Sequence, residues 1–197
     1  MSDGSATPRV SSRAFGLGLT VLGLTGLGAA FALTIERIRL LEDPAYSPSC
    51  DLNPIISCGS VMVTPQATAF GFPNPLLGLV AFTVVVTLGV LLLAGARPPR
   101  WILAGLAIGA TAGLLGVHWL IAQSLYDINA LCPWCMLVWI VTMPIAVWSV
   151  FAAIPDRLWG RAVTALWSVR YLVVTFWYLV IAVLILVRFW DYWRTLL

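Results

Sequence analysis

Residues 132–154 read CPWCMLVWIVTMPIAVWSVFAAI, a stretch that joins a pair of cysteines directly to an apolar run long enough to cross a membrane. A helix of about 20 predominantly apolar residues spans the hydrocarbon core of a bilayer. Comparable apolar stretches lie near residues 14–35, 75–96, 101–125 and 171–190. The sequence therefore predicts an all-α integral membrane protein with five transmembrane helices.

The composition excludes an ordinary soluble domain. Of the 197 residues, 61% are hydrophobic and 10% are charged, whereas about a quarter of the residues in a soluble domain are charged. The apolar run at residues 14–35 is longer than the roughly 7–15 residues of a signal-peptide core, so we expect it to be retained as a helix. We expect one membrane domain over residues 1–197, with residues 36–74 as its long loop.

The eleven basic residues are all arginines, and their distribution predicts the orientation of the chain. Cytoplasmic segments of membrane proteins carry an excess of Lys and Arg. With a cytoplasmic N-terminus, the inner segments hold Arg9, Arg13, Arg97, Arg100, Arg157, Arg161 and Arg170. The outer segments then hold only Arg37, Arg39, Arg188 and Arg194. We therefore expect the N-terminus in the cytoplasm and all four cysteines on the outer face.

The long loop changes character at Cys58. Before this residue the loop is polar and rich in turn-forming residues such as Pro44 and Asn53. Residues 59–72 are mixed with apolar side chains, which is typical of a short helix in the membrane interface. We expect this second part to cover the helix bundle.

The motif Cys132-Pro-Trp-Cys135 opens the fourth apolar stretch. Proline is favoured in the first turn of a helix, so Cys132 is expected at a helix N-terminus. The unpaired N–H groups and the helix dipole favour a thiolate there. The two-residue spacing suits either a disulfide or a zinc site.

Three kinds of protein fit two cysteine pairs in a membrane chain: a scaffold with structural disulfides, a metal-handling protein and a thiol relay. Cys50 and Cys58 are separated by seven residues, and His118, the single histidine, lies within the third apolar stretch, so we expect no metal site. Two dithiols on one face can exchange through a mixed disulfide. A relay at the membrane edge needs a lipid-soluble electron acceptor, and a quinone meets that need.

The sequence also resembles the vitamin K epoxide reductase family, in its bacterial disulfide-forming branch. The motifs that carry the resemblance are Cys50-Asp51, Ser57-Cys58, Phe70-Gly71, Asn74-x-x-x-Gly78 and Cys132-x-x-Cys135. The resemblance implies a four-helix bundle around a quinone, capped by the loop, with a peripheral fifth helix.

The resemblance also implies unequal roles for the four cysteines. Cys135 corresponds to the thiol that faces the quinone. In the family this thiol forms a transient adduct or charge-transfer pair with the quinone. Cys132 corresponds to the thiol that resolves this adduct and forms the disulfide with Cys58 between the two pairs. Cys50 corresponds to the loop thiol that exchanges with a protein partner.

Three further residues are implied as quinone contacts. Asn74 resembles the asparagine that hydrogen-bonds a quinone carbonyl, and Phe70 belongs to a motif near the same pocket. Trp139 stands one helical turn after Cys135, where animal enzymes carry a tyrosine that also contacts the quinone.

The activity implied is quinone-dependent oxidation of thiols in the inner membrane of a bacterium, with menaquinone or ubiquinone, or a related vitamin K-type quinone or epoxide, as acceptor. Many bacterial relatives continue into a fused thioredoxin-like domain. This chain ends at Leu197, a few residues past the fifth apolar stretch, so we expect a separate thioredoxin-fold, DsbA-like partner on the outer face.

Two ionisable residues near the outer end leave alternatives open. His118 is either functional or a neutral imidazole bonded to a backbone carbonyl. Asp127 either helps to protonate a reduced quinone or caps a turn.

Overall fold

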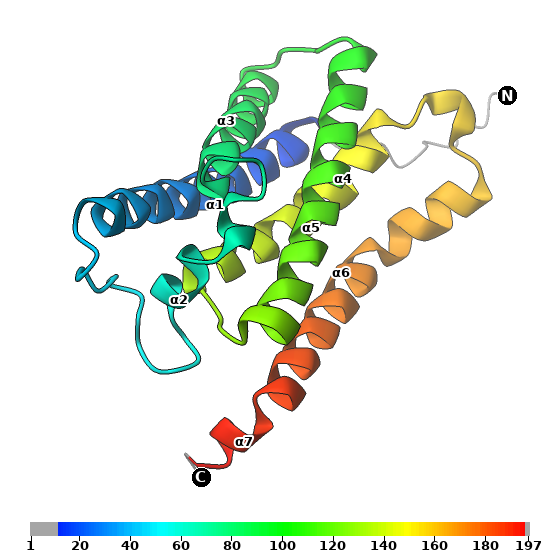
Figure 1. The fold of residues 1–197 in the computed structure, drawn as a ribbon. Coiled ribbons are helices and arrows are strands. Elements are labelled where there is room, and N and C mark those ends of the chain that lie inside the picture. The colour runs from blue at the N-terminus through cyan, green and yellow to red at the C-terminus, as the bar shows by residue number, and fades with distance from the viewer. Residues whose placement is uncertain (1–11, 196–197) are drawn as a thin grey trace, which may run out of the picture.

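The computed structural model describes residues 12–195 of the chain; residues 1–11, among them Arg9, and 196–197 lie outside the described part. Five long helices make up most of it (Figure 1). They are α1 (Ser12–Glu42), α3 (Asn74–Leu93), α4 (Arg100–Gln123), α5 (Pro133–Ala153) and α6 (Arg161–Arg188). All five are long and apolar enough to cross a membrane, which confirms the predicted all-α transmembrane fold.

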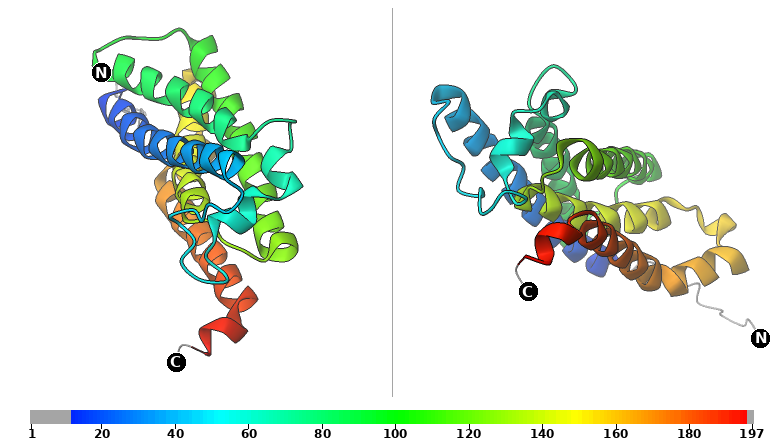
Figure 2. Two further views of the ribbon diagram at one scale, coloured as in Figure 1. Left: turned by 60° about the vertical axis from the view of Figure 1, so that its left-hand side comes forward. Right: turned by 60° about the horizontal axis from the view of Figure 1, so that its bottom comes forward.

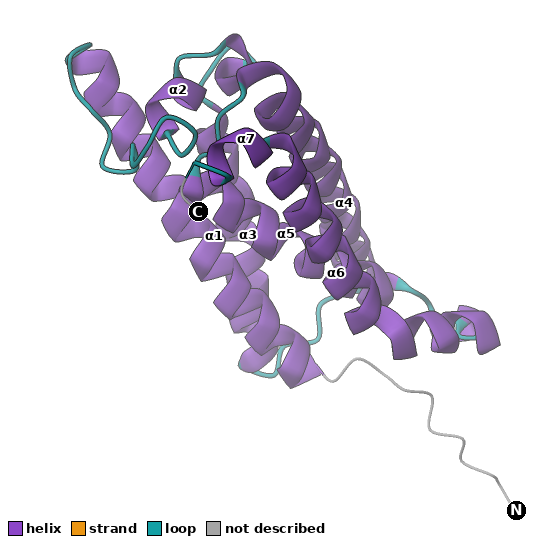
Figure 3. Cartoon of the chain, turned by 90° about the horizontal axis from the view of Figure 1, so that it is seen from below, coloured by secondary structure: helices purple, strands orange, loops and turns teal. Residues whose placement is uncertain are grey.

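Short elements connect the long helices. They are α2 (Cys58–Met62), the 3₁₀ helices η1 (Pro65–Thr68) and η3 (Asp156–Leu158), the π-helical turn η2 (Ser124–Ile128) and α7 (Trp190–Trp193). Figure 3 shows that α2, the loop before it and α7 gather at one end of the bundle, which we call the cysteine end. The expected short helix over residues 59–72 is split in two because Pro65 has no N–H with which to continue α2.

Two long helices extend beyond their predicted bounds. The first was expected at residues 14–35 and continues to Glu42, and the last was expected to begin at residue 171 and begins at Arg161. Hydropathy locates only the apolar part of a helix. The more polar turns at residues 36–42 and 161–170 continue these two helices beyond that part. The loop at the cysteine end is correspondingly shorter than residues 36–74.

Helices α1 and α3 pack side by side (Figure 2) because glycines remove side chains from their contact. A Cβ atom on Gly16 would lie 2.9 Å from the Leu92 Cβ, and one on Gly89 would lie 2.7 Å from the Thr20 backbone nitrogen. Small residues allow transmembrane helices this close approach. The glycine-rich first span thus packs tightly against the second, as its composition predicts.

Helix α5 is the centre of the bundle, since it packs against α1, α4 and α6. One core cluster joins the ends of α1, α3, α4 and α5 that lie away from the cysteine end. Its buried members are Phe15, Leu19, Phe82, Val85, Leu92, Leu106, Val141 and Ile145. Helix α6 contributes no buried residue of its own, so it is peripheral, as the family resemblance implied.

A proline in α5 creates the attachment point for α6. Pro144 has no N–H to donate to the carbonyl of Ile140 four residues earlier, which leaves that carbonyl without its helical partner. The Tyr178 hydroxyl of α6 donates a hydrogen bond to the Ile140 oxygen at 2.6 Å. The sequence feature that interrupts α5 therefore also docks α6.

Two further side chains attach α6 near the cysteine end. The Trp177 indole donates to Nε2 of His118 at 2.9 Å, while Nδ1 of His118 lies 2.8 Å from the Leu114 carbonyl. Both ring nitrogens of His118 thus have hydrogen-bond partners. Arg188 donates to the Leu125 carbonyl at 2.7 Å.

Candidate functional site

Cys50 and Cys58 form a disulfide within the loop at the cysteine end. Cys58 is the first residue of α2, and the helix start is held from two directions. The Ser57 hydroxyl accepts the Ser60 N–H at 3.0 Å, and an oxygen of Asp51 accepts the Gly59 N–H at 2.9 Å. These bonds orient Cys58, whose side chain is fully buried.

The second pair lies at the start of α5. Cys132 is the N-cap residue and Pro133 is the first helical residue, as the motif predicts. The Cys132 sulfur accepts the Cys135 N–H at 3.5 Å. Cys132 is fully buried, and Cys135 is half-buried.

Cys132 lies just before the membrane span that begins at Pro133, and hydrogen bonds from neighbouring residues stabilise its thiolate. A hydrogen bond from the Cys135 thiol lowers the pKa of Cys132 below the ordinary value, against the opposing effect of burial. The N–H groups of Cys135 and Trp134 at the helix start lower it further, whereas the negative charge of Asp51 opposes this. The net direction favours a thiolate on Cys132.

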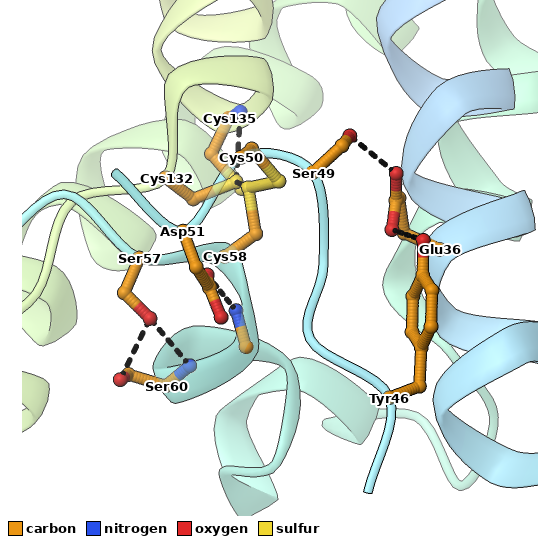
Figure 4. The surroundings of a disulfide bond; sticks show 11 residues. Glu36, Tyr46, Ser49, Cys50, Asp51, Ser57, Cys58, Ser60, Cys132 and Cys135 are labelled. Atoms are coloured by element: carbon orange, nitrogen blue, oxygen red, sulfur yellow. Dashed lines mark hydrogen bonds between the residues drawn. A yellow bond between two sulfur atoms is a disulfide. The ribbon is translucent and has the colours of Figure 1, made fainter. Parts of the chain in front are cut away.

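The two cysteine pairs meet at a single sulfur–sulfur contact (Figure 4), in which the Cys132 Sγ lies 3.2 Å from the Cys58 Sγ. A short parallel pairing between the loop and the segment before α5 sets this contact. The Leu131 N–H donates to the Ile55 carbonyl at 2.7 Å, and the Ser57 N–H donates to the Leu131 carbonyl at 2.9 Å. Reacting atoms about 3–3.5 Å apart are in position for attack, so the arrangement permits thiol–disulfide exchange between the pairs.

A large cavity of about 1160 Å³ opens among α3, α4 and α5. Its lining is almost entirely apolar and includes Val138 and Ile145 of α5 and a row of glycines on α4. Phe70 and Asn74 line it at the cysteine end. The cavity suits an apolar, lipid-soluble molecule.

Asn74 is held by the loop that covers the cavity. Its Nδ2 donates to the backbone carbonyl of Gln66 at 2.7 Å, while its Oδ1 is buried without a hydrogen-bond partner. The Gln66 side chain in turn donates to Gln123 Oε1 at 3.2 Å and to the Asp127 carboxylate. Asp127 thus anchors the loop that covers the cavity. The unpaired Asn74 oxygen is an acceptor for a hydrogen-bond donor in the cavity.

Trp139 lies apart from Phe70 and Asn74, the other two predicted quinone contacts. It is buried in a cluster with Val117, Ile121 and Phe189, and it lines a smaller pocket of about 260 Å³ between α5 and α6. Cys135 packs against this cluster and also against a second cluster, which contains Cys50, Cys58 and Cys132. It precedes the cavity residue Val138 by about one helical turn. The structure thus brings the four cysteines together and places Phe70 and Asn74 in the cavity, with Trp139 on the α6 side.

Sequence reasoning missed one group of residues beside the cysteines. Glu36 is buried and accepts hydrogen bonds from Tyr46 and Ser49, the residue before Cys50. The sequence signal that could have identified Glu36 is a carboxylate directly after the apolar run of α1. A buried charge needs specific hydrogen-bond partners, so such a residue points to a polar contact with the loop.

Comparison with curated proteins found no match. A sequence model of the Vitamin K epoxide reductase family, in contrast, matches residues 17–150, which include all four cysteines, Asn74 and the helices that form the cavity. The chain belongs to the vitamin K epoxide reductase family.

Proposed function

We propose that this chain is a quinone-dependent oxidoreductase that reoxidises a separate thioredoxin-fold protein by passing electrons from Cys50 and Cys58 to Cys132 and Cys135. Family membership implies a membrane thiol oxidoreductase that works with a quinone. The observation that carries the finer proposal is the 3.2 Å separation between the Cys58 and Cys132 sulfurs. It supports direct exchange between the loop pair and the pair at the start of α5.

The first exchange takes electrons from the partner. A thiolate of the reduced partner attacks the Cys50 sulfur, which forms a mixed disulfide and releases Cys58 as a thiolate. The second thiol of the partner then attacks the partner's sulfur in the mixed disulfide and releases Cys50. The partner leaves oxidised, and Cys50 and Cys58 are left as thiols.

The second exchange passes the electrons inward. The Cys58 thiolate attacks Cys132 in a Cys132–Cys135 disulfide, and Cys135 is released with the electron pair. Cys50 then attacks Cys58, which restores the loop disulfide and releases Cys132. The lowered pKa of Cys132 supports this step, since a sulfur with a lower thiol pKa is a better leaving group.

The state of the structure, with a Cys50–Cys58 disulfide and free thiols at Cys132 and Cys135, corresponds to the product of this second exchange. The acceptor must then remove two electrons and two protons from the second pair, which is the chemistry that a quinone supplies. The apolar cavity fits such a molecule, and the buried, unpaired Asn74 oxygen can accept a hydrogen bond from a hydroxyl of the reduced quinone. Phe70 and Asn74 would hold it, and Cys135 would be the thiol nearest the cavity residue Val138.

The proposed orientation places the cysteine end outside the cytoplasm, in a bacterial inner membrane. The seven-to-four distribution of arginines over the expected inner and outer segments supports it. An extracytoplasmic location also suits disulfide chemistry, because thiols in the cytosol are kept reduced.

The decisive experiment combines the purified protein, a water-soluble menaquinone or ubiquinone analogue and a reduced thioredoxin-fold protein. Quinone reduction should be abolished by Cys135→Ala, and persistence of the reaction would rule out the mechanism. A reduced partner whose second cysteine is changed to alanine should trap a mixed disulfide with Cys50 of the parent chain, because its thiolate attacks the Cys50–Cys58 disulfide, releases Cys58 and has no second thiol to complete the exchange. Cys50→Ala/Cys58→Ala should trap none. A scaffold with structural disulfides or a metal-handling protein predicts no quinone reduction by the unaltered chain.

A further inference from the structure

The cysteine that receives the partner in the proposed relay is not accessible in this structure. Cys50 is 7% exposed and Cys58 is 0% exposed. An incoming thiolate must approach a sulfur along the disulfide axis, which buried sulfurs do not allow. The loop must therefore move before Cys50 can react with another protein.

The segment that leads into Cys50 is fastened to α1 by a buried carboxylate. Glu36 is 7% exposed, and each of its two carboxylate oxygens accepts a hydrogen bond from a hydroxyl of this segment. The Tyr46 hydroxyl donates to Oε2 at 2.8 Å, and the Ser49 hydroxyl donates to Oε1 at 2.6 Å. Figure 4 shows both hydroxyls pointing from the loop toward Glu36, with Cys50 directly after Ser49.

Other hydrogen bonds of this segment are mostly local. The Tyr46 N–H donates to Asp43, and the Asp51 N–H donates to Pro48, which shapes turns without fastening them to a helix. Arg39 adds a bond to the Tyr46 hydroxyl at 3.3 Å and so belongs to the same group. Hydrogen bonds to a charged acceptor are about twice as strong as neutral ones, and a buried carboxylate strongly resists losing them.

We propose that Glu36 is a positioning residue that holds Cys50 in its buried place through Tyr46 and Ser49, and that release of these two bonds admits the thioredoxin-fold partner. This inference rests on the proposed function. With the bonds made, the loop disulfide stays against Cys132 and internal exchange is favoured. With the bonds broken, Cys50 becomes accessible and exchange with the partner is favoured.

The first test isolates the loop disulfide. In a Cys132→Ser/Cys135→Ser background, dithiothreitol attacks Cys50, releases Cys58 and closes to its own cyclic disulfide, so that neither quinone nor partner is needed. Reduction is followed by the gel shift of a polyethylene-glycol maleimide. Glu36→Ala should speed reduction about tenfold or more, since loss of one bond to a charged group changes an equilibrium by about that factor. Tyr46→Phe and Ser49→Ala should each have a smaller effect in the same direction.

Two controls separate this role from general destabilisation. Glu42→Gln removes an exposed carboxylate near the same end of α1, and it should leave the reduction rate unchanged. Tyr178→Phe removes a hydrogen bond far from the loop, and it should also leave the rate unchanged. If Glu36→Ala does not fold, Tyr46→Phe and Ser49→Ala still decide the matter. Rates equal to that of the parent in all Glu36, Tyr46 and Ser49 variants would overturn the proposal.

The second test looks for the opposite effect on internal exchange. The fully reduced chain with all four cysteines is given a pulse of quinone analogue, and the Cys50–Cys58 disulfide is quantified by mass spectrometry. Glu36→Ala should form it several-fold more slowly than the parent, although its loop is reduced faster by dithiothreitol. Absence of any oxidation in the parent would contradict the proposed function, whereas equal rates in parent and variant would contradict the role of Glu36.

Discussion

The backbone N–H of Ser57 donates a hydrogen bond to the carbonyl of Leu131 at 2.9 Å, and these two residues immediately precede Cys58 and Cys132. A hydrogen bond between neighbouring backbones sets the register of the residues that follow it. Because both cysteines are the next residue along their segments, this bond and the bond from the Leu131 N–H to the Ile55 carbonyl place Cys58, rather than Cys50, against Cys132. The order of the proposed relay therefore depends on backbone contacts in which no sulfur takes part.

This register predicts which disulfide accumulates when the relay is interrupted. In Cys50→Ala, Cys58 can attack an oxidised Cys132–Cys135 pair, and no Cys50 remains to displace Cys132. We expect a Cys58–Cys132 disulfide after oxidation with a quinone analogue, because the two sulfurs lie 3.2 Å apart. Peptide mapping after alkylation measures it. Detection of Cys58–Cys135 in its place would contradict the register, and Cys50→Ala/Cys132→Ala serves as the control.

The pKa of Cys132 predicts a pH profile. Hydrogen bonding from Cys135 lowers the pKa, so the reactive thiolate persists to lower pH than in an ordinary cysteine and is lost as the pH falls through the lowered value. In a Cys50→Ala/Cys58→Ala background, the rate of alkylation of Cys132 by iodoacetamide should reach its plateau at a lower pH than the rate for an ordinary cysteine thiol. Adding Cys135→Ala should move the inflection to higher pH. An unmoved inflection would mean that Cys135 does not stabilise the thiolate.

The bonds of Gln66 predict a role in quinone binding. Gln66→Leu removes the side-chain bonds to Gln123 and Asp127 that hold the loop over the cavity. We expect the KM for a quinone analogue to rise about 2–10-fold, the factor that loss of a typical hydrogen bond produces. Reduction of the loop disulfide by dithiothreitol should not change. Thr68→Val, which removes only a bond within η1, is the matched control.

The docking of α6 predicts a coupling between Tyr178 and Pro144. Tyr178→Phe leaves the Ile140 carbonyl without its partner, and we expect a loss of about 0.5–2 kcal/mol in unfolding free energy. Pro144→Ala restores an N–H that can pair with that carbonyl within α5. In the Pro144→Ala background, Tyr178→Phe should therefore cost less. A double-mutant cycle measured by denaturant unfolding tests this, and additive effects would contradict the coupling.

The elements read most directly from the sequence were those with a local cause. Five apolar stretches became five long helices because each stretch must satisfy its own backbone hydrogen bonds in lipid. Pro133 predicted the helix start that makes Cys132 an N-cap. Pairing of the cysteines by motif likewise pointed to the residues that meet at the site.

Other features depended on contacts between distant segments. The contact of Trp139 with a quinone stays a prediction. A helix that is apolar on all sides does not show in its sequence which face meets which neighbour, and only the structure places Trp139 between α5 and α6. Glu36 is buried because the loop folds back and brings the hydroxyls of Tyr46 and Ser49 to its carboxylate.

The sequence by itself thus determined the five spans, the helix start at Cys132 and the chemistry of two dithiols at a membrane edge, because hydropathy and capping act over a few neighbouring residues. Only the tertiary structure decided the 3.2 Å approach of the Cys58 and Cys132 sulfurs, the walls of the cavity that Asn74 and Phe70 line, and the bond from Ser49 to Glu36 before Cys50. These relationships join segments far apart in the chain, and packing and buried hydrogen bonds set them.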